Sequence, residues 1–457
     1  MSPKSTAPTS GITSHAANPG HAADPGRISD LARDIRNGAV SPVDLVQRYL
    51  DRIAAVDPAV EAWREVSADA ARTEAADRAA DIENGIIRGP LHGVPVGVKD
   101  IIDVAGLPTR CNSNSRAQAG PASADAEVVA ALRAAGAIIL GKTHTTEFAY
   151  RDPSPARNPH NLDHTPGGSS SGSGAAVAAG MVPAALGTQT MASVNRPAAY
   201  CGIGAFKPST RLMPGFGVEP LSYLYDTVGF YGGRVEDAAT LFEAVCPHHA
   251  RHTNAESPNS LRIVIPDDSF IEDADGEIQR AMERATGQLR DAGHAVEHRP
   301  SPVSFKRLHD LHRMTMEYDI GRTRRAFLDE AEGQIGVHLL EVIQSGLAIP
   351  AADYRDGRRE IDSLRDAFFT AFADADAFLW PATPKTAPKG LSWTGDAKYI
   401  SPWTALGGPV VTMPTGQSAA KLPIGCLVAG APGADFGFAR IARKVADAAE
   451  DHDTVIS

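Results

Sequence analysis

The chain has 457 residues, of which 44 are Lys or Arg and 55 are Asp or Glu, so its formal net charge is −11 at pH 7. An acidic excess repels phosphate backbones and anionic headgroups, which disfavours nucleic acids and membrane surfaces as partners. No stretch is apolar for long enough to span a bilayer. The four cysteines are widely spaced, without a C-x-x-C pair, as is typical of a reduced chain. We therefore expect a soluble, cytoplasmic protein.

The sequence divides into a tail and one domain. Residues 1–26 mix Ser, Ala, Pro, Gly and His without the apolar run of a secretory signal, and they predict a disordered tail. Residues 27–457 are long enough to bury a substantial core. Within this domain we distinguish an N-terminal helical segment over 27–90, a core over 91–246 that carries the candidate site, and the remainder of the core over 259–457.

The first predicted elements are two helices and a strand. Ser41, Pro42 and Asp44 are typical of a helix start, with a capping hydroxyl, a proline at the first helical position and a carboxylate in the first turn. A stretch rich in Ala, Asp and Glu predicts a second helix over 67–84. The β-branched run over 93–100 then predicts a buried strand that brings Lys99 to an edge of the sheet.

Helices and strands alternate along the rest of the chain. Apolar spacing predicts a helix over 126–135 and a strand over 137–140. Residues 167–204 are rich in Gly, Ala and Ser, which permits close backbone approach. The alternation indicates an α/β sheet with covering helices. Further on, we expect helices within 278–373 and strands over 261–266, 377–380 and 409–413.

Two short motifs match known patterns but lack the required context. Residues 136–143 match a phosphate-binding loop, yet the four loop positions are apolar and follow a helix, so a strand is expected there. Residues 168–172 match the G-x-S-x-G nucleophile elbow, with Ser170 at its centre. That elbow follows a strand, whereas residues 161–166 have the composition of a loop, so an α/β-hydrolase is the weaker hypothesis.

A third pattern extends over several segments. Lys99 at a strand end, the Gly-Gly-Ser-Ser loop at 167–170 and the segment 187–197 with Ser193 follow one another in the chain. In these segments, and again at 381–384 and 422–425, the chain resembles the amidase signature family. The resemblance implies an α/β/α sandwich, with a mixed central β-sheet covered by helices.

The resemblance also implies a Ser–Ser–Lys triad. Ser193 would attack the substrate, Ser169 would relay its proton and Lys99 would accept it, because a serine hydroxyl needs a neighbouring base. Lysine is a base only when neutral, and burial among small apolar residues lowers its pKa. A simpler alternative is an ion pair between Lys99 and Asp100. By the resemblance, the peptide bond of Ser169 would be a rare non-proline cis bond.

Further site residues follow from the same resemblance. The chain has Gln189, Met191 and Ala192 where the family commonly has Asp, Gly and Gly, and these departures leave the pocket and substrate open. The oxyanion would be bound by backbone N–H groups of Thr190, Met191, Ala192 and Ser193. Supporting residues would be Ser170, Gln189 and Arg196. Aromatic and Met side chains favour an apolar acyl or aryl group, and the candidate substrate-binding residues are Asn112, Phe148, Tyr150, Met191 and Tyr223.

We expect an amidase that hydrolyses a small, aryl or alkyl amide through a Ser193 acyl-enzyme, without a metal, nucleotide or organic cofactor. A carbamate or ester hydrolase of the same fold remains an alternative. Another is the glutaminase-type subunit of a tRNA-dependent amidotransferase, which would require partner chains. A catalytically silent scaffold is disfavoured because all three triad residues are present. The expected partner is a small-molecule amide or carbamate, and a homodimer is left open.

One cluster resembles a metal site. Cys246 is followed by His248, His249 and His252, but the spacing matches no recognised zinc motif and the segment is polar. We therefore expect a solvated surface linker and no metal.

Overall fold

The computed structural model describes residues 22–246 and 258–451. Its strands are β1 (Trp63–Val66), β2 (Pro95–Lys99), β3 (Ile138–Thr143), β4 (Ala184–Gln189), β5 (Gly204–Lys207), β6 (Thr227–Gly232), β7 (Arg262–Asp267), β8 (Ala295–Pro300), β9 (Ala377–Pro381), β10 (Val410–Gln417) and β11 (Pro423–Ala429). Its α-helices are α1 (Ile28–Arg36), α2 (Pro42–Val60), α3 (Ala68–Glu83), α4 (Glu127–Ala134), α5 (Ser171–Ala178), α6 (Asn195–Cys201), α7 (Val235–Val245), α8 (Gly276–Asp291), α9 (Phe305–Thr323), α10 (Val337–Ala348), α11 (Ala351–Ala371), α12 (Ser401–Leu406) and α13 (Asp435–Ala449).

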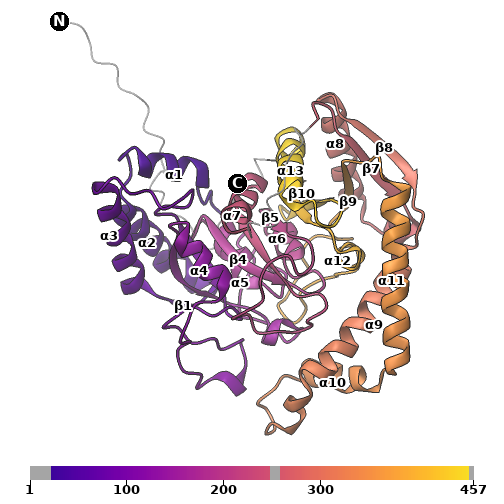
Figure 1. Ribbon diagram of the computed structural model, residues 1–457, viewed down its shortest axis with the longest axis horizontal. Helices are drawn as coiled ribbons and strands as arrows, with labels where there is room; N and C mark the ends of the chain where they lie inside the picture. The colour runs from indigo at the N-terminus through magenta and orange to yellow at the C-terminus, as the bar shows by residue number, and fades with distance from the viewer. Residues whose placement is uncertain (1–21, 247–257, 452–457) are drawn as a thin grey trace, which may run out of the picture.

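Within the described residues the strands form one 11-stranded mixed sheet, in the order β1-β3-β2-β4-β6-β5-β10-β11-β9-β7-β8 (Figure 1). β3, β2 and β4 are parallel to one another near one end, as are β9, β7 and β8 at the other. The remaining neighbours are antiparallel. Helix α4 connects β2 to β3 and helix α5 connects β3 to β4, because parallel strands need a crossover.

Helices cover both faces of this sheet. Along β9, Leu379 belongs to the apolar core shared with α4, α7 and α13, whereas the next residue, Trp380, belongs to a core shared with α9, α11 and α12. Successive side chains of a strand point to opposite faces, so these two cores lie on opposite sides. Helices α2, α3, α5 and α6 enclose a third core that includes Ala185 of β4, whose neighbour Leu186 belongs to the first. The predicted α/β/α sandwich is confirmed.

Several predicted elements occur where the sequence indicates them. Helix α2 begins at Pro42, and Ser41 Oγ accepts a hydrogen bond from Val43 N at 3.2 Å. Helices α3 and α4 and strand β2 lie within their predicted ranges. Residues 138–143 are strand β3, fully buried inside the sheet, so the match to a phosphate-binding loop falls on a strand, as expected.

The helical stretch expected over 278–373 is interrupted by a strand, β8. This strand is the last of the sheet, and of its side chains only Val296 is buried. An edge strand with one buried side chain lacks the apolar alternation by which strands are predicted. Its pairing with β7, which runs parallel to it, therefore becomes visible only in the fold.

The boundary of the tail differs from the expectation. Residues 1–21 of the predicted tail lie outside the described residues, but residues 22–26 contact the domain. Ala23 N donates to Ala178 O at 3.0 Å, and Tyr49 Oη donates to Pro25 O at 2.5 Å. The end of the predicted tail therefore belongs to the packed structure.

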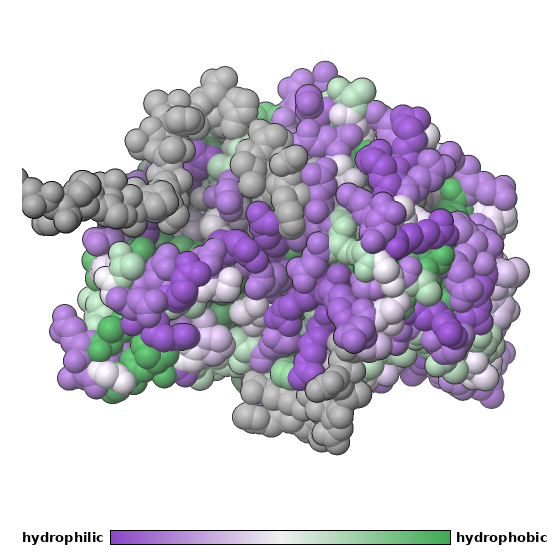
Figure 2. Space-filling model, turned by 90° about the horizontal axis from the view of Figure 1, so that it is seen from above, coloured by the Kyte–Doolittle hydropathy of each residue, from purple (hydrophilic) through white to green (hydrophobic). Residues whose placement is uncertain are grey.

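The face in Figure 2 is mainly hydrophilic, with hydrophobic residues in separate small groups. Over the described ranges, no helix combines the length and apolar character needed to cross a bilayer. Nor do three or more metal-ligating side chains come together there. Cys246 was expected on a solvated surface, but it is buried against the core, and the three histidines that follow it lie outside the described residues.

Candidate active site

Lys99 is the last residue of β2, and its side chain is fully buried. Its Nζ lies 2.7 Å from Ser169 Oγ and 2.8 Å from Thr188 Oγ1. Ser169 lies in the loop before α5, and Thr188 lies near the end of β4, which pairs in parallel with β2. The carboxyl ends of parallel strands meet at one sheet edge, so the fold brings a lysine amine between two hydroxyl groups.

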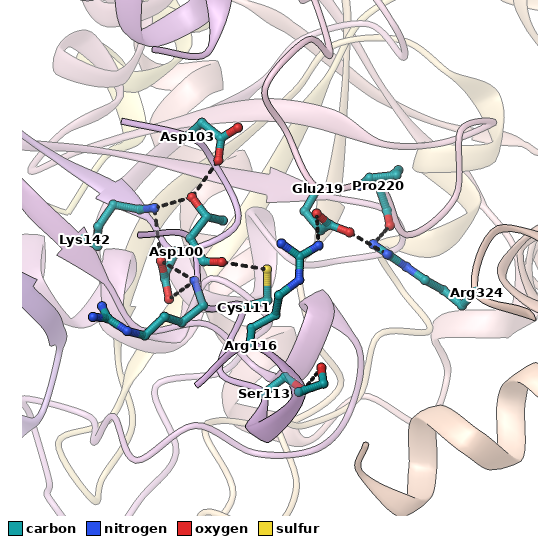
Figure 3. Close-up of polar contacts among 12 residues, drawn as sticks. Asp100, Asp103, Cys111, Ser113, Arg116, Lys142, Glu219, Pro220 and Arg324 are labelled. Carbon is teal, nitrogen blue, oxygen red and sulfur yellow. Dashed lines mark hydrogen bonds and ion pairs between the residues drawn. The ribbon is translucent and has the colours of Figure 1, made fainter. Parts of the chain in front are cut away.

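The charge of Lys99 is poorly supported by its surroundings. Burial lowers the pKa of Lys99 well below its ordinary value of 10.5, against a smaller opposing effect of the Asp226 carboxylate. The neighbouring Asp100 forms an ion pair with Lys142 at 3.0 Å, and Lys142 also lies 3.0 Å from Thr109 Oγ1 (Figure 3). The alternative of a Lys99–Asp100 pair is therefore wrong, and burial favours a neutral amine.

The loop that carries Ser169 is held by hydrogen bonds on both sides. The Gly168–Ser169 peptide bond is cis, as the resemblance implied. Arg196 Nη2 donates to Gly168 O at 2.6 Å, and Thr146 N donates to Ser169 O at 3.1 Å. Burial lowers the pKa of Arg196 to about 10, so its guanidinium stays charged at neutral pH. Arg196 thus supports the position of Ser169.

Ser170 has a different environment from Ser169. Its side chain is buried, and its Oγ donates to Thr188 O and accepts from Thr188 N, both at 3.2 Å. The preceding residues 161–166 contain no strand. A nucleophile elbow exposes its serine after a strand, so the local structure does not match the G-x-S-x-G hypothesis.

Ser193 lies in the loop between β4 and α6 and is 8% exposed. Each carbonyl oxygen in residues 190–193 accepts a hydrogen bond. The four pairs are Thr190 O with His312 Nε2 (3.0 Å), Met191 O with Thr404 Oγ1 (2.7 Å), Ala192 O with Arg196 N (2.9 Å) and Ser193 O with Tyr231 Oη (3.1 Å). The loop is thereby anchored to α9, α12, α6 and β6.

The N–H groups of this loop are arranged differently. In the described part of the chain, the backbone N–H groups of Met191, Ala192 and Ser193 donate to no protein acceptor. Burial lowers the pKa of His312 to about 3, so its imidazole is neutral and donates its proton to Thr190 O. Anchored carbonyls and free N–H groups are a suitable arrangement for binding an oxyanion.

Gln189 fixes the two ends of the same loop. Its Oε1 accepts from Val194 N at 2.8 Å and from Asn195 N at 3.0 Å, which satisfies donors at the start of α6. Its Nε2 donates to Thr404 Oγ1 at 3.0 Å. A side-chain carbonyl oxygen can accept both bonds, so this residue accounts for the loop conformation despite the departure from the family's usual Asp.

A cavity of about 350 Å³ opens beside these residues. Thr188 and Thr190 line it, whereas Ser169 and Ser193 do not. The apolar part of its wall consists of Ile101, Ala149, Met213, Pro214, Val218, Pro220, Leu221 and Val228.

The predicted substrate-binding residues are only partly brought together. Tyr223 lines this cavity and is 67% exposed. Phe148 is 1% exposed and packs on Phe327, and Asn112 Nδ2 donates to Pro153 O. Tyr150 and Met191 are half-buried against the core. These four residues do not line the cavity.

Comparisons with known proteins agree with this arrangement. A family model described as Amidase matches residues 44–437. The chain belongs to the amidase signature family. Lys99 ends β2, Ser169 lies between β3 and α5, and Ser193 lies between β4 and α6, so the three residues follow three consecutive strands of the chain.

Individual relatives differ in their names. The chain is 33% identical over 445 residues to the A subunit of glutamyl-tRNA(Gln) amidotransferase from Roseiflexus castenholzii, covering 87% of this chain and 90% of the relative. A solved structure called an amidase is 29% identical, with a TM-score of 0.82 and coverage of 91% and 98%. Native peptide amidase from Stenotrophomonas maltophilia is 28% identical, with a TM-score of 0.77 and coverage of 92% and 96%. The name of the Roseiflexus relative matches an alternative that the sequence left open.

The sequence did not predict the residues that contact Lys99 or anchor the loop over residues 190–193. Thr188, Tyr231, His312 and Thr404 contact Lys99 or the loop carbonyls from four elements. Thr188 lies in the 187–197 segment, and the resemblance of that segment to the family was a signal that could have identified it. The other three carry no local signal, because their roles depend on contacts across the fold.

Proposed function

We propose that this amidase hydrolyses a carbon–nitrogen acyl bond through an acyl-enzyme on Ser193. The observation that supports this most strongly is the buried Lys99, which lies 2.7 Å from Ser169 Oγ and has no ion-pair partner among the described residues. A neutral amine in that position can act as a general base toward the Ser169 hydroxyl.

The proton would move along the three side chains. Neutral Lys99 accepts the proton of Ser169, which takes the proton of Ser193 as Ser193 Oγ attacks the acyl carbon. The oxygen that becomes negative accepts hydrogen bonds from the free N–H groups of Met191, Ala192 and Ser193. The same relay returns the proton to the leaving nitrogen, and water then attacks the acyl-enzyme and releases the acid.

The test combines active-site labelling with turnover. A fluorophosphonate should label the wild-type chain at Ser193, and Ser193→Ala should lose both labelling and turnover of aryl amides while keeping its melting temperature. Mass spectrometry of the labelled peptide identifies the residue. Labelling at Ser170, or unchanged turnover by Ser193→Ala, would refute the proposal.

The identity of the substrate is part of the same proposal. Simple amides are our main candidates, and a panel of anilides, short aliphatic amides, carbamates and esters would rank them against the alternatives. The panel should be run on the purified chain alone, because a stand-alone hydrolase needs no second protein.

A second candidate is favoured by the relatives named as amidotransferase A subunits, which match nearly the whole chain. In this case the chain would release ammonia from glutamine as part of an assembly with partner chains. Ammonia release from glutamine separates the two candidates when it is measured with the purified chain alone and with the chain mixed with the other amidotransferase chains.

Light scattering of the pure chain tests whether it is a monomer or a homodimer.

A further inference from the structure

The cavity beside the loop has an apolar wall and three charged side chains, Arg211, Glu219 and Asp226. Its volume of about 350 Å³ lies in the usual range for small-molecule pockets. If Ser193 attacks an amide, as proposed above, a chain attached to that amide can extend past Thr190 and Thr188 into this space. The three charged groups then decide which chains are accepted.

Glu219 is already neutralised. Its Oε2 accepts from Arg116 Nη2 at 2.9 Å, and its Oε1 accepts from Arg324 Nη1 at 2.5 Å. Figure 3 shows both guanidinium groups directed at this carboxylate, and Arg324 also donates to the Pro220 carbonyl. Both oxygens of Glu219 therefore have a guanidinium partner, and the group formed by Glu219, Arg116 and Arg324 has a net positive charge.

Asp226 is occupied as well. Its Oδ1 accepts from Thr190 Oγ1 at 2.6 Å, and its Oδ2 accepts from Leu221 N at 2.7 Å and Ser222 N at 3.0 Å. Burial raises the pKa of Asp226 to about 6, so the carboxylate stays mostly ionised at pH 7 and is protonated in mildly acidic solution. Both acidic side chains of the lining are therefore already engaged by donors of the protein.

Arg211 differs from the other two charged residues of the lining. Arg211 is exposed, and its side chain forms no hydrogen bond or ion pair with the described residues. It also borders a neighbouring cavity that includes Asp362, but Asp362 Oδ1 accepts from Arg365 at 2.9 Å. Its φ of +63° lies in the left-handed region, which favours glycine. The turn that Leu212 N closes on Ser209 O at 3.0 Å holds this conformation, and it leaves the guanidinium beside the pocket available to an anionic group.

We propose that Arg211 is a specificity-determining residue that binds a carboxylate on the substrate. The preferred substrates would be amides whose apolar chain ends in a carboxylate, with the chain along the wall formed by Met213, Val218 and Leu221. A planar guanidinium matches a carboxylate with two parallel hydrogen bonds. This assignment distinguishes anionic amides from both neutral amides and zwitterionic ones.

The test compares matched substrates that differ only in the carboxylate. On the acyl side, the pair is hexanoyl p-nitroanilide and the mono-p-nitroanilide of adipic acid. On the amine side, the pair is acetanilide and 4-acetamidobenzoate. The wild-type enzyme should hydrolyse the anionic member of at least one pair with the higher kcat/KM, mainly through a lower KM, and added salt should reduce this preference.

Variants of Arg211 assign the preference to its side chain. Arg211→Gln should reduce the preference by about 2- to 5-fold, as expected for an ion pair made by an exposed arginine, while turnover of the neutral amide is retained. Arg211→Lys should restore part of it, and Arg211→Gly should lose it without a lower melting temperature, because glycine tolerates the positive φ. Arg280→Gln, an exposed arginine of α8, is the matched control.

The outcomes separate this inference from the proposed function. Hydrolysis with the same preference in the wild type and Arg211→Gln, or a preference for the neutral amide in both pairs, overturns the role of Arg211 but leaves the Ser193 mechanism intact. No hydrolysis of any of the four amides, together with no labelling of Ser193, refutes the proposed function itself.

Discussion

At the scale of single residues, the proposed mechanism depends on the protonation state of Lys99. Burial disfavours the charged amine and lowers the pKa of Lys99, so the neutral base becomes populated at a lower pH than for free lysine. We therefore predict that kcat/KM rises with pH through an apparent pKa below 10.5 and then levels off. Initial rates of hydrolysis of a neutral amide, measured at a series of pH values, would give this apparent pKa.

The variants of Lys99 provide the control for this profile. Lys99→Ala should lose several orders of magnitude in kcat/KM at pH 7, and Lys99→Arg should not restore activity because a guanidinium stays protonated. A Lys99→Ala enzyme with native activity and an unchanged profile would exclude lysine as the base.

Ser170 allows a second prediction at this scale. Its hydroxyl bonds both backbone groups of Thr188, so Ser170→Ala should lower the free energy of unfolding by about 1–3 kcal/mol, the usual effect of unpaired buried groups. Most of the turnover should remain. Ser169→Ala, one residue earlier, should instead abolish turnover. Urea denaturation and kcat for the two variants give the comparison, and a reversed result would favour the nucleophile-elbow hypothesis.

At the scale of elements, the junction between β4 and α6 is held by Gln189. Gln189→Ala leaves Val194 N and Asn195 N without their acceptor, so we predict a loss of about 1–3 kcal/mol in unfolding free energy. Under the proposed mechanism the fall in kcat should exceed the change in KM, because the loop would present the oxyanion donors. Gln189→Glu keeps an acceptor for the two N–H groups, but it loses the bond to Thr404 and buries a carboxyl group, so it should also be less stable than the wild type. Native kcat in Gln189→Ala would contradict this role.

At the scale of the whole molecule, the N-terminal segment tests where the domain begins. Deletion of residues 1–21 should leave the melting temperature and activity nearly unchanged, because the composition of this segment is too polar and too rich in Gly and Pro to bury a core face. Deletion of residues 1–26 should lower the melting temperature, because the bonds from Ala23 N to Ala178 O and from Tyr49 Oη to Pro25 O are lost. Calorimetry of both deletions, with Tyr49→Phe as a point variant, measures the effect. Equal melting temperatures would show that the contacts contribute no stability.

The sequence by itself determined the elements whose signals are local. The cap at Ser41, the helices after it and the β-branched run that ends at Lys99 follow from propensity and apolar periodicity, and the structure has them in these ranges. The order of the Lys99, Gly-Gly-Ser-Ser and Ser193 segments was enough to predict the family and with it the mixed sandwich.

Only the tertiary structure decided how the site is supported. Asp100 pairs with Lys142 rather than Lys99, and His312 and Thr404 hold a loop more than a hundred residues away in sequence. Four of the five predicted pocket residues are not part of the wall of the cavity that Thr188 and Thr190 line. The pairing of edge strand β8 with β7 was likewise decided by the tertiary structure. Such contacts join side chains that are distant in sequence, and no local propensity or periodicity encodes which distant partner a buried polar group will meet.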